Sequence, residues 1–321
     1  MRSLKTLLDP QLRLKYPKVA IIGFLMTKTW GVRLLTFLTR LSDGKNIDGL
    51  DCSQQHIPSG SGGPDIRLRI FKPRNVNGPL PCLLFLHGGG YMIGNPEATF
   101  NSIKQFIYTR PCIAIAPDYR KSVEAPYPAA FNDCYDTLLW IRDNAAFLGV
   151  RADQIIVGGP SAGGGLTAAL TLKARDTGDV KIAFQMPLYP MIDDRQNTES
   201  ARQMTLYPWD ARLNKKGWDL YLAGLNQTHA EIPAYAAPAR NNDYTDFPPT
   251  ITFVGDLEPF RDETIAYAEA LSAAGIPVAF ELFKGCFHGF DLIAPDAGIS
   301  KKANRFLLEA YGRYYDQCFK V

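Results

Sequence analysis

The sequence predicts an α/β fold, in which a mostly parallel sheet carries helices on both faces. Two observations predict it. Continuous apolar runs of strand length recur along the 321 residues, and such runs are typical of strands that are buried on both faces. Helical patterns separate these runs, and strands that alternate with helices favour parallel order in the sheet.

The elements are expected in the following order. Residues 1–50 are helical, because apolar side chains there recur at spacings of three and four. Ser59–Pro64 forms a turn or a hairpin tip, and a half-buried strand follows from Ile66, where apolar residues alternate with Arg67 and Arg69. Buried strands are then predicted at 81–86, 112–116, 155–157, 184–188, 251–254 and 278–283, and helices at 129–143, 166–176, 264–274 and 302–319.

The alternation is interrupted between residues 191 and 235, where aromatic residues are scattered among polar ones. We interpret this stretch as a helical insertion that forms a lid over the sheet edge together with the N-terminal helices. The chain is accordingly divided into an N-terminal helical cap segment (1–50), the first part of the core (51–190), the cap insertion (191–235) and the second part of the core (236–321).

Composition excludes several classes of protein. The net charge of +3 is too small to indicate a nucleic-acid partner. The six cysteines form no C-x-x-C pair and no zinc spacing, so we expect free thiols, no metal, and a reducing, cytoplasmic location. Val19–Met26 is shorter than the roughly 20 apolar residues that a spanning helix requires. We therefore expect a helix that packs on the protein and no membrane span.

The segment Gly159-Pro160-Ser161-Ala162-Gly163 predicts a nucleophile elbow. It follows the apolar run 155–157 and opens a helix-like run. Glycines on both sides of a serine suit a tight strand-to-helix turn, because side chains there would collide. The pentapeptide alone also fits an incidental glycine-rich turn, so its setting carries the prediction.

Backbone donors for an oxyanion are expected from two places. Gly88, Gly89 and Gly90 follow His87 at the end of a predicted buried strand, and glycines leave their N–H groups unobstructed. Ala162 follows the serine directly. Together these N–H groups would surround a developing alkoxide. The alternative without a catalytic role is that the glycine run forms a flexible turn.

A base and an acid are expected in the last two strand-end loops. His288 follows the last predicted strand, at the carboxyl edge where open α/β sheets form their sites, although a lone histidine is more often structural. Asp256, Glu258 and Asp262 crowd the preceding loop, and any of them could orient the imidazole. Asp262 best suits the alternative role of a helix N-terminal charge. The order serine, acid, histidine is that of α/β-hydrolases.

From about residue 65 onward, the chain resembles the hormone-sensitive-lipase-like family of α/β-hydrolase esterases, of the bacterial type. The motifs that carry the resemblance are His87–Gly90, Asp118–Arg120, Ala125–Ala130, Gly159–Gly164 and Phe287–Phe290. The resemblance implies an eight-stranded, mostly parallel sheet with a helical cap. It also implies cleavage of short-chain carboxylic esters without a cofactor.

Two positions depart from the family pattern. Pro160 stands where the family usually has aspartate before the serine, and it restricts Gly159 to extended conformations. The family acid usually begins an Asp-Pro-x-Arg-Asp run, whose counterpart here begins at Glu258. The resemblance therefore assigns the acid to Glu258 and leaves Asp256 as the alternative. Asp118–Arg120 follows the predicted strand at 112–116 and is interpreted as a structural segment that supports the loop through ion pairing.

The sequence thus predicts a serine carboxylesterase that hydrolyses short- to medium-chain esters through an acyl-enzyme intermediate. Its partner is a small-molecule ester, and pairing into a homodimer is left open. The alternatives are the same chemistry on lactone, carbonate or amide bonds, and a non-catalytic ligand-binding protein on the same fold. Trp30, Trp209 and Trp218 either line the acyl pocket or pack in the core.

Overall fold

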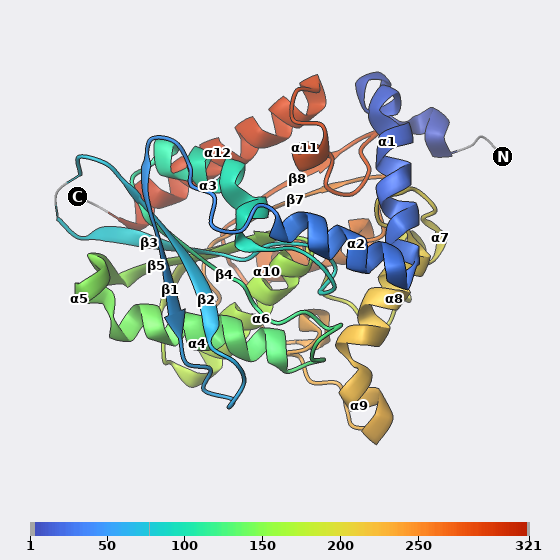
Figure 1. Ribbon diagram of the computed structural model, residues 1–321. Helices are drawn as coiled ribbons and strands as arrows, with labels where there is room; N and C mark the ends of the chain where they lie inside the picture. The colour runs from blue at the N-terminus through green and yellow to red at the C-terminus, as the bar shows by residue number, and fades with distance from the viewer. Residues whose placement is uncertain (1–3, 77, 320–321) are drawn as a thin grey trace.

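One eight-stranded sheet organises the chain in a computed structural model that describes residues 4–76 and 78–319 (Figure 1). The strands lie in the order β1-β2-β4-β3-β5-β6-β7-β8. All neighbours from β4 to β8 pair in parallel, whereas β1 and β2 form an antiparallel hairpin whose second strand also runs antiparallel to β4. The strands are β1 (Leu50–Ile57), β2 (Ile66–Pro73), β3 (Leu80–Phe85), β4 (Ile113–Pro117), β5 (Val150–Pro160), β6 (Ile182–Leu188), β7 (Thr250–Gly255) and β8 (Val278–Phe283).

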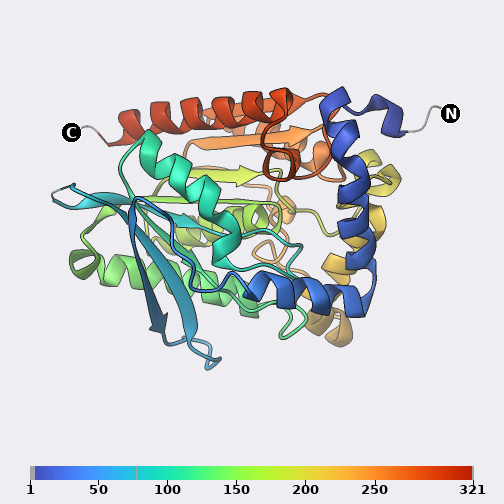
Figure 2. The same cartoon turned by 45° about the horizontal axis from the view of Figure 1, so that its top comes forward.

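Helices cover both faces of this sheet, as Figure 2 shows. The helices α3 (Phe100–Thr109) and α12 (Gly298–Cys318) cover one face. The opposite face is covered by α4 (Ala129–Asp143), α6 (Ala162–Thr177) and α10 (Arg261–Ala273). Two apolar cores therefore lie on the two sides of the central strands, which explains why those strands are continuous apolar runs.

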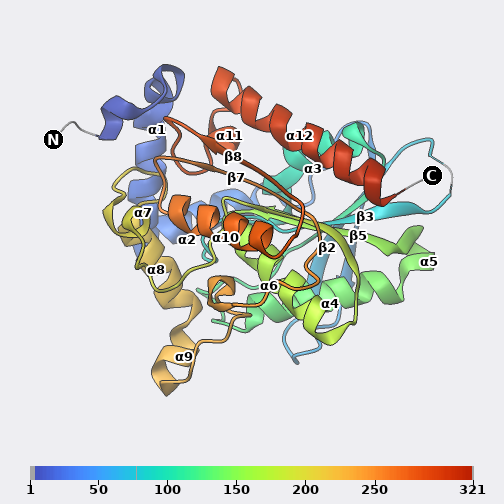
Figure 3. The same cartoon turned by 180° about the vertical axis from the view of Figure 1, so that it is seen from behind.

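The remaining helices gather beside the carboxyl ends of the parallel strands (Figures 1 and 3). They are α1 (Pro10–Thr27) and α2 (Thr29–Arg40) from the N-terminal segment, and α7 (Glu199–Gln203), α8 (Ala211–Tyr221) and α9 (Ala223–Thr228) from the insertion. Short elements complete the chain: η1 (Leu4–Leu7), η2 (Pro96–Thr99), α5 (Ala145–Leu148), η3 (Pro238–Arg240) and α11 (Phe290–Ile293).

No single helix in the described ranges has the length and apolar character to cross a membrane. The helices α1 and α2 meet those criteria only when they are taken together across a bend of 115°.

The expected α/β class and the eight-stranded, mostly parallel sheet are confirmed. Every apolar run that was predicted to be a strand is one, and 191–235 holds helices but no strand. The division of the chain into cap and core segments stays a prediction. The elements that were not foreseen include β1, in which most residues are polar, and α3. The expectation that 1–50 is helical is wrong at 41–49, which form turns and irregular backbone, and its first three residues lie outside the described ranges.

The expectation of a half-buried β2 is wrong at Arg69, which is only 3% exposed. Its guanidinium finds partners inside the protein, because Nη2 donates to the carbonyl of Lys45 at 2.7 Å and to Asn46 Oδ1 at 2.9 Å, and Nη1 lies 3.7 Å from Glu97 Oε1. The strand β2 is therefore covered on both faces at this point, although its sequence alternates. An arginine is rarely buried unless it is paired, and Arg69 has such partners.

Candidate active site

Ser161 lies at a sharp turn between β5 and α6. Its backbone has φ 59° and ψ −120°, a strained conformation for a residue with a side chain. The turn is held by a hydrogen bond from the Ser161 N–H to the Leu188 carbonyl at 2.9 Å. Glycine is required at Gly159 and Gly163, because a Cβ at either position would lie 2.3 Å or less from the Leu86 carbonyl oxygen. Gly159 and Pro160 are the last residues of β5, so the proline fits this extended segment.

The side chains of Ser161, His288 and Glu258 form a continuous hydrogen-bonded chain. His288 Nε2 lies 2.9 Å from Ser161 Oγ, and His288 Nδ1 lies 2.5 Å from Glu258 Oε2. The second carboxylate oxygen, Glu258 Oε1, accepts a hydrogen bond from the Gly255 N–H at 2.9 Å. All three side chains are buried, and they come from the loops after β5, β8 and β7. Parallel strands bring these loops to one edge of the sheet.

The other two carboxylates of the β7 loop lie away from His288. Asp256 Oδ1 accepts from the N–H groups of Gly285 at 2.7 Å and Cys286 at 3.3 Å. Asp262 lies in the first turn of α10, where it accepts from the Ser200 N–H at 2.8 Å. Both carboxylates thus have structural partners, and Glu258 alone of the three contacts the imidazole among the described hydrogen bonds.

Aromatic rings fix the orientation of His288. Tyr189 and Phe260 meet its imidazole edge-on, with ring centroids 5.2 Å and 5.0 Å away, and Trp209 lies at 6.4 Å. Sequence reasoning did not find Tyr189 or Phe260, because each comes from a different loop and carries no motif. Of the tryptophans considered from the sequence, Trp209 lines the cavity described below and Trp218 packs in the core, whereas Trp30 does neither, because it is exposed.

The glycine loop after β3 faces Ser161. A Cβ on Gly88 would lie 3.4 Å from the Cβ of Ser161, which measures how closely this loop approaches the serine. His87 at the start of the loop stacks on Tyr119 at 4.1 Å, and the Tyr119 hydroxyl donates to the His87 carbonyl at 2.7 Å. Burial lowers the pKa of His87 to about 3, so its ring stays neutral at ordinary pH.

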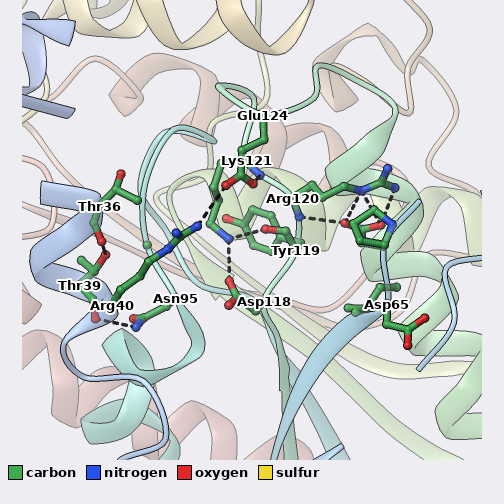
Figure 4. Close-up of a pocket in the computed structure, with 14 residues that line it drawn as sticks. Thr36, Thr39, Arg40, Asp65, Asn95, Asp118, Tyr119, Arg120, Lys121 and Glu124 are labelled. Atoms are coloured by element: carbon green, nitrogen blue, oxygen red, sulfur yellow. Dashed lines mark hydrogen bonds and ion pairs between the residues drawn. The ribbon is translucent and has the colours of Figure 1, made fainter. Parts of the chain in front are cut away.

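Ion pairs of the residues on either side of Tyr119 hold this ring in place, and Figure 4 shows the pair between Asp118 and Lys121. Asp118 accepts hydrogen bonds from Lys121 at 2.9 Å and from Arg67 at 2.9 Å. Burial alone would raise the pKa of Asp118, but these cations hold it below its ordinary value. Arg120 pairs with buried Asp133 in the same segment. These contacts fit the buttress expected of Asp118–Arg120.

A cavity of about 270 Å³ opens onto Ser161 and His288. No aspartate, glutamate, lysine or arginine lines it. Its apolar wall is drawn from four separate parts of the chain: Met26, Phe85, Ile93, Ala98, Pro208, Trp209, Leu292 and Ile293. Thr39, Thr99 and Ser102 add hydroxyl groups. Across residues 4–76 and 78–319, no three histidine, cysteine, aspartate or glutamate side chains are grouped so that they could hold a metal ion.

Comparison with known proteins places the chain in a family. The sequence profile of a family described by its alpha/beta hydrolase fold matches residues 83–292, which include Ser161, Glu258 and His288. The chain belongs to the hormone-sensitive-lipase-like α/β-hydrolases. The resemblance seen in the sequence is thereby confirmed.

Relatives of this α/β-hydrolase include named esterases. It is 32% identical to the carboxylesterase NlhH of Mycobacterium tuberculosis, over 73% of this chain and 74% of that protein. It is 31% identical to an arylesterase of Saccharolobus solfataricus, over 70% of this chain and 73% of that one. Among solved structures it is similar to a bacterial heroin esterase, with a TM-score of 0.85, 32% identity, and coverage of 97% of this chain and 99% of the other.

A second buried carboxyl, Asp291, lies close to the site of this α/β-hydrolase. Its Oδ2 accepts a hydrogen bond from the Tyr189 hydroxyl at 3.2 Å, and its Oδ1 has no partner among the described residues. Burial raises the pKa of Asp291 to about 6. The folded protein therefore binds this proton more tightly than the unfolded chain does, so stability is lost as the pH rises from about 4 through about 6.

Replacing Asp291 with asparagine is expected to remove this pH dependence, because the amide stays neutral. Relative to the wild type, the free energy of unfolding of Asp291→Asn should rise by about 2.4 kcal/mol between pH 4 and pH 7.5, since two pKa units correspond to about 2.7 kcal/mol and the carboxyl of the unfolded chain is already partly ionised at pH 4. Urea unfolding of both proteins at the two pH values measures this difference. If the free energies of unfolding of the variant and the wild type differed by the same amount at both pH values, the expectation would be contradicted.

Proposed function

We propose that this carboxylic ester hydrolase cleaves short- to medium-chain esters through an acyl-enzyme intermediate on Ser161. The observation that carries the proposal is the hydrogen-bonded chain from Ser161 through His288 to Glu258, open to an apolar cavity. A nucleophile, a base and an acid that orients the base are the three side chains that acyl transfer by serine needs.

In the proposed reaction, Ser161 Oγ attacks the ester carbonyl while His288 Nε2 takes its proton. The Glu258 carboxylate holds His288 in the tautomer whose Nε2 can accept a proton, and it stabilises the imidazolium that forms. Backbone N–H groups of Gly88, Gly89, Gly90 and Ala162 serve as oxyanion donors. His288 then protonates the departing alcohol, and water attacks the acyl-enzyme by the same steps in reverse order.

The lining of the cavity supports an uncharged acyl group as the substrate. A carboxylate or ammonium group placed there would lose its hydration without gaining an ionic partner, which is costly. A volume of about 270 Å³ is at the lower limit of small-molecule pockets, which span about 300–1,000 Å³. These two features favour short and medium aliphatic chains over long ones.

The oxyanion role of the glycine loop makes Gly89→Ala damaging. Gly89 has φ +125°, and a Cβ there would lie 2.0 Å from the carbonyl oxygen of Ile93, so the loop would have to shift. Loss of one oxyanion donor lowers kcat by about 10²- to 10³-fold, and we expect a loss of that size with little change in KM. The matched control is Gly62→Ala, which also has positive φ but no atom within 4 Å of the added Cβ. Equal rates in the two variants would remove Gly89 from the oxyanion site.

The proposed substrate class is tested by steady-state kinetics on p-nitrophenyl esters with acyl chains from two to sixteen carbons. We expect kcat/KM to rise up to about fourfold for each methylene that the cavity accommodates, since burial of a methylene contributes about 0.8 kcal/mol. The value should then fall steeply for the longest chains. A maximum at sixteen carbons would contradict the proposed chain length, and no hydrolysis at any length would contradict the proposed function.

A further inference from the structure

The two N-terminal helices carry apolar side chains on their outer surface. On α2, Trp30, Leu34, Phe37 and Leu41 follow one another at spacings of four, three and four residues, so they share one side of the helix. Each of them is between 41% and 60% exposed. On α1, the exposed apolar residues include Leu14, Ile21 and Phe24. We call these seven residues the α1–α2 face.

The opposite sides of the same helices already pack on the protein. Leu12, Tyr16, Val19 and Met26 of α1 are buried, as is Val32 of α2. The apolar character of the α1–α2 face is therefore additional to what holds these helices on the fold. The apolar side chains of the α1–α2 face are thus left uncovered by the described parts of the chain.

The charged side chains of the two helices are all basic, and within the described ranges only Lys15 and Arg40 among them pair with acidic residues elsewhere, Asp296 and Glu124. Residues 10–42 contain no aspartate or glutamate, whereas the rest of the chain has 29 basic against 32 acidic residues. The six basic residues of this stretch are Arg13, Lys15, Lys18, Lys28, Arg33 and Arg40. Arg33 and Lys18 are exposed and form no ion pair within the described parts of the chain. On the helical wheel, Arg33 and Arg40 lie beside the apolar stripe of α2.

This combination selects the kind of partner. A second copy of the chain would bring an equal positive charge against this one, which costs free energy on association. Exposed leucine, phenylalanine and tryptophan beside lysine and arginine are instead typical of helices that lie in the plane of an anionic lipid surface. Tryptophan favours the boundary between headgroups and acyl chains, and Trp30 is exposed at the bend between the two helices.

The same helices reach the cavity. Met26 at the end of α1 and Thr39 of α2 line it, and Leu292 at its rim is itself 44% exposed. Figures 1 and 2 show α1 and α2 on the outside of the molecule, meeting at an angle in front of the strand ends. An ester dissolved in a lipid layer would thus meet the protein next to the helices that border the cavity.

We propose that the α1–α2 face docks the enzyme in the plane of an anionic lipid surface. The two helices lie on the surface and do not span it, since one side of each stays packed on the protein. The apolar side chains enter the layer, and the basic side chains contact the lipid headgroups. This binding is independent of the reaction at Ser161, so the two can be tested separately.

The test is flotation of the full chain with vesicles of phosphatidylcholine and phosphatidylglycerol in equal amounts, and with vesicles of phosphatidylcholine alone. We expect binding to the mixed vesicles in 0.05 M salt, at least tenfold weaker binding to the neutral ones, and at least tenfold weakening by 0.5 M salt, which shortens the range of the charges. The fluorescence of Trp30 should shift to shorter wavelength on binding, and this shift should be absent in Trp30→Ser.

Two pairs of substitutions separate the apolar from the charged contribution. Trp30→Ser with Phe37→Ser should weaken binding at least tenfold. Lys18→Gln with Arg33→Gln should weaken it about 25-fold, because each basic residue near an anionic surface is worth about 1 kcal/mol, or about fivefold. The control is Tyr108→Ser with Phe147→Ser, two aromatic residues that are 60% and 73% exposed elsewhere on the molecule. None of these six residues lines the cavity, so hydrolysis of a water-soluble ester should be unchanged in all of them.

Three outcomes would overturn the proposal. The first is no binding to either kind of vesicle, and the second is equal binding to both. In the third, the wild type does not bind vesicles and sediments as a dimer, whereas the variant with Trp30→Ser and Phe37→Ser sediments as a monomer. That result would assign the face to a second copy of the chain.

Discussion

Ser161→Ala is expected to lower kcat for p-nitrophenyl butyrate by about 10⁵- to 10⁶-fold. The methyl group that replaces the hydroxymethyl group cannot attack the carbonyl, and loss of a catalytic serine elsewhere costs about 10⁶-fold. KM should change little, because the cavity wall is untouched. Residual activity of the oxyanion donors and the cavity would still exceed the uncatalysed rate by about 10³- to 10⁴-fold. Steady-state kinetics on carefully purified protein measures this loss.

The control for this variant is Ser122→Ala. Ser122 is also buried, but its hydroxyl has no hydrogen-bond partner among the described residues and it lies outside the cavity. Its removal should leave both kcat and stability nearly unchanged, since no partner is left unpaired. If Ser161→Ala retained wild-type kcat, the proposed nucleophile would be wrong.

Glu258→Gln is expected to lower kcat by about 10⁴-fold without unfolding the protein. The glutamine can place its amide N–H₂ group against His288 Nδ1, which then has to accept a hydrogen bond. Nε2 would in consequence carry the proton and donate to Ser161, so the imidazole could no longer act as the base. In serine proteases, a substitution that leaves the catalytic histidine in the wrong tautomer lowers kcat by about 10⁴-fold.

Asp256→Asn is the matched variant, because Asp256 was the alternative acid and lies two residues away in the same loop. Its Oδ1 accepts from the amides of Gly285 and Cys286, and the oxygen of asparagine can accept the same two hydrogen bonds, so we expect a stability close to that of the wild type and a nearly unchanged kcat. Urea unfolding and kinetics of the two variants separate these effects. A larger loss of kcat in Asp256→Asn than in Glu258→Gln would reverse the assignment.

The fold was predictable in its central strands because burial on both faces leaves a continuous apolar run in the sequence. At the edge this signal fails. The strand β1 pairs only with β2, and six of its eight residues are exposed or half-buried, so its sequence resembles a loop. Arg69 shows the converse. Its place in an alternating pattern predicts contact with solvent, but the residue is buried. Its partners, Lys45 and Asn46, lie more than twenty residues away, so the local sequence does not reveal them.

The residues of the candidate site were predictable to different degrees for a physical reason. Ser161 and the glycine loop carry local backbone requirements, which leave glycines in the sequence. The choice between Glu258 and Asp256 instead depends on the direction of two side chains and on contacts with the β8 loop, about 30 residues away. Spacing does not encode those contacts, and only the resemblance to a family favoured Glu258. The rings that orient His288, from Tyr189 and Phe260, carry no signal in the sequence.

The central claim is that Ser161 is a nucleophile activated by His288, and a fluorophosphonate tests it most directly. Such a probe phosphonylates only an activated serine. Intact mass spectrometry followed by peptide mapping should find one adduct per chain, on Ser161, in the wild type and in Asp256→Asn. Glu258→Gln should react much more slowly, and Ser161→Ala should form no adduct. An unreactive wild-type protein, or an adduct on another residue that persists in Ser161→Ala, would contradict the account.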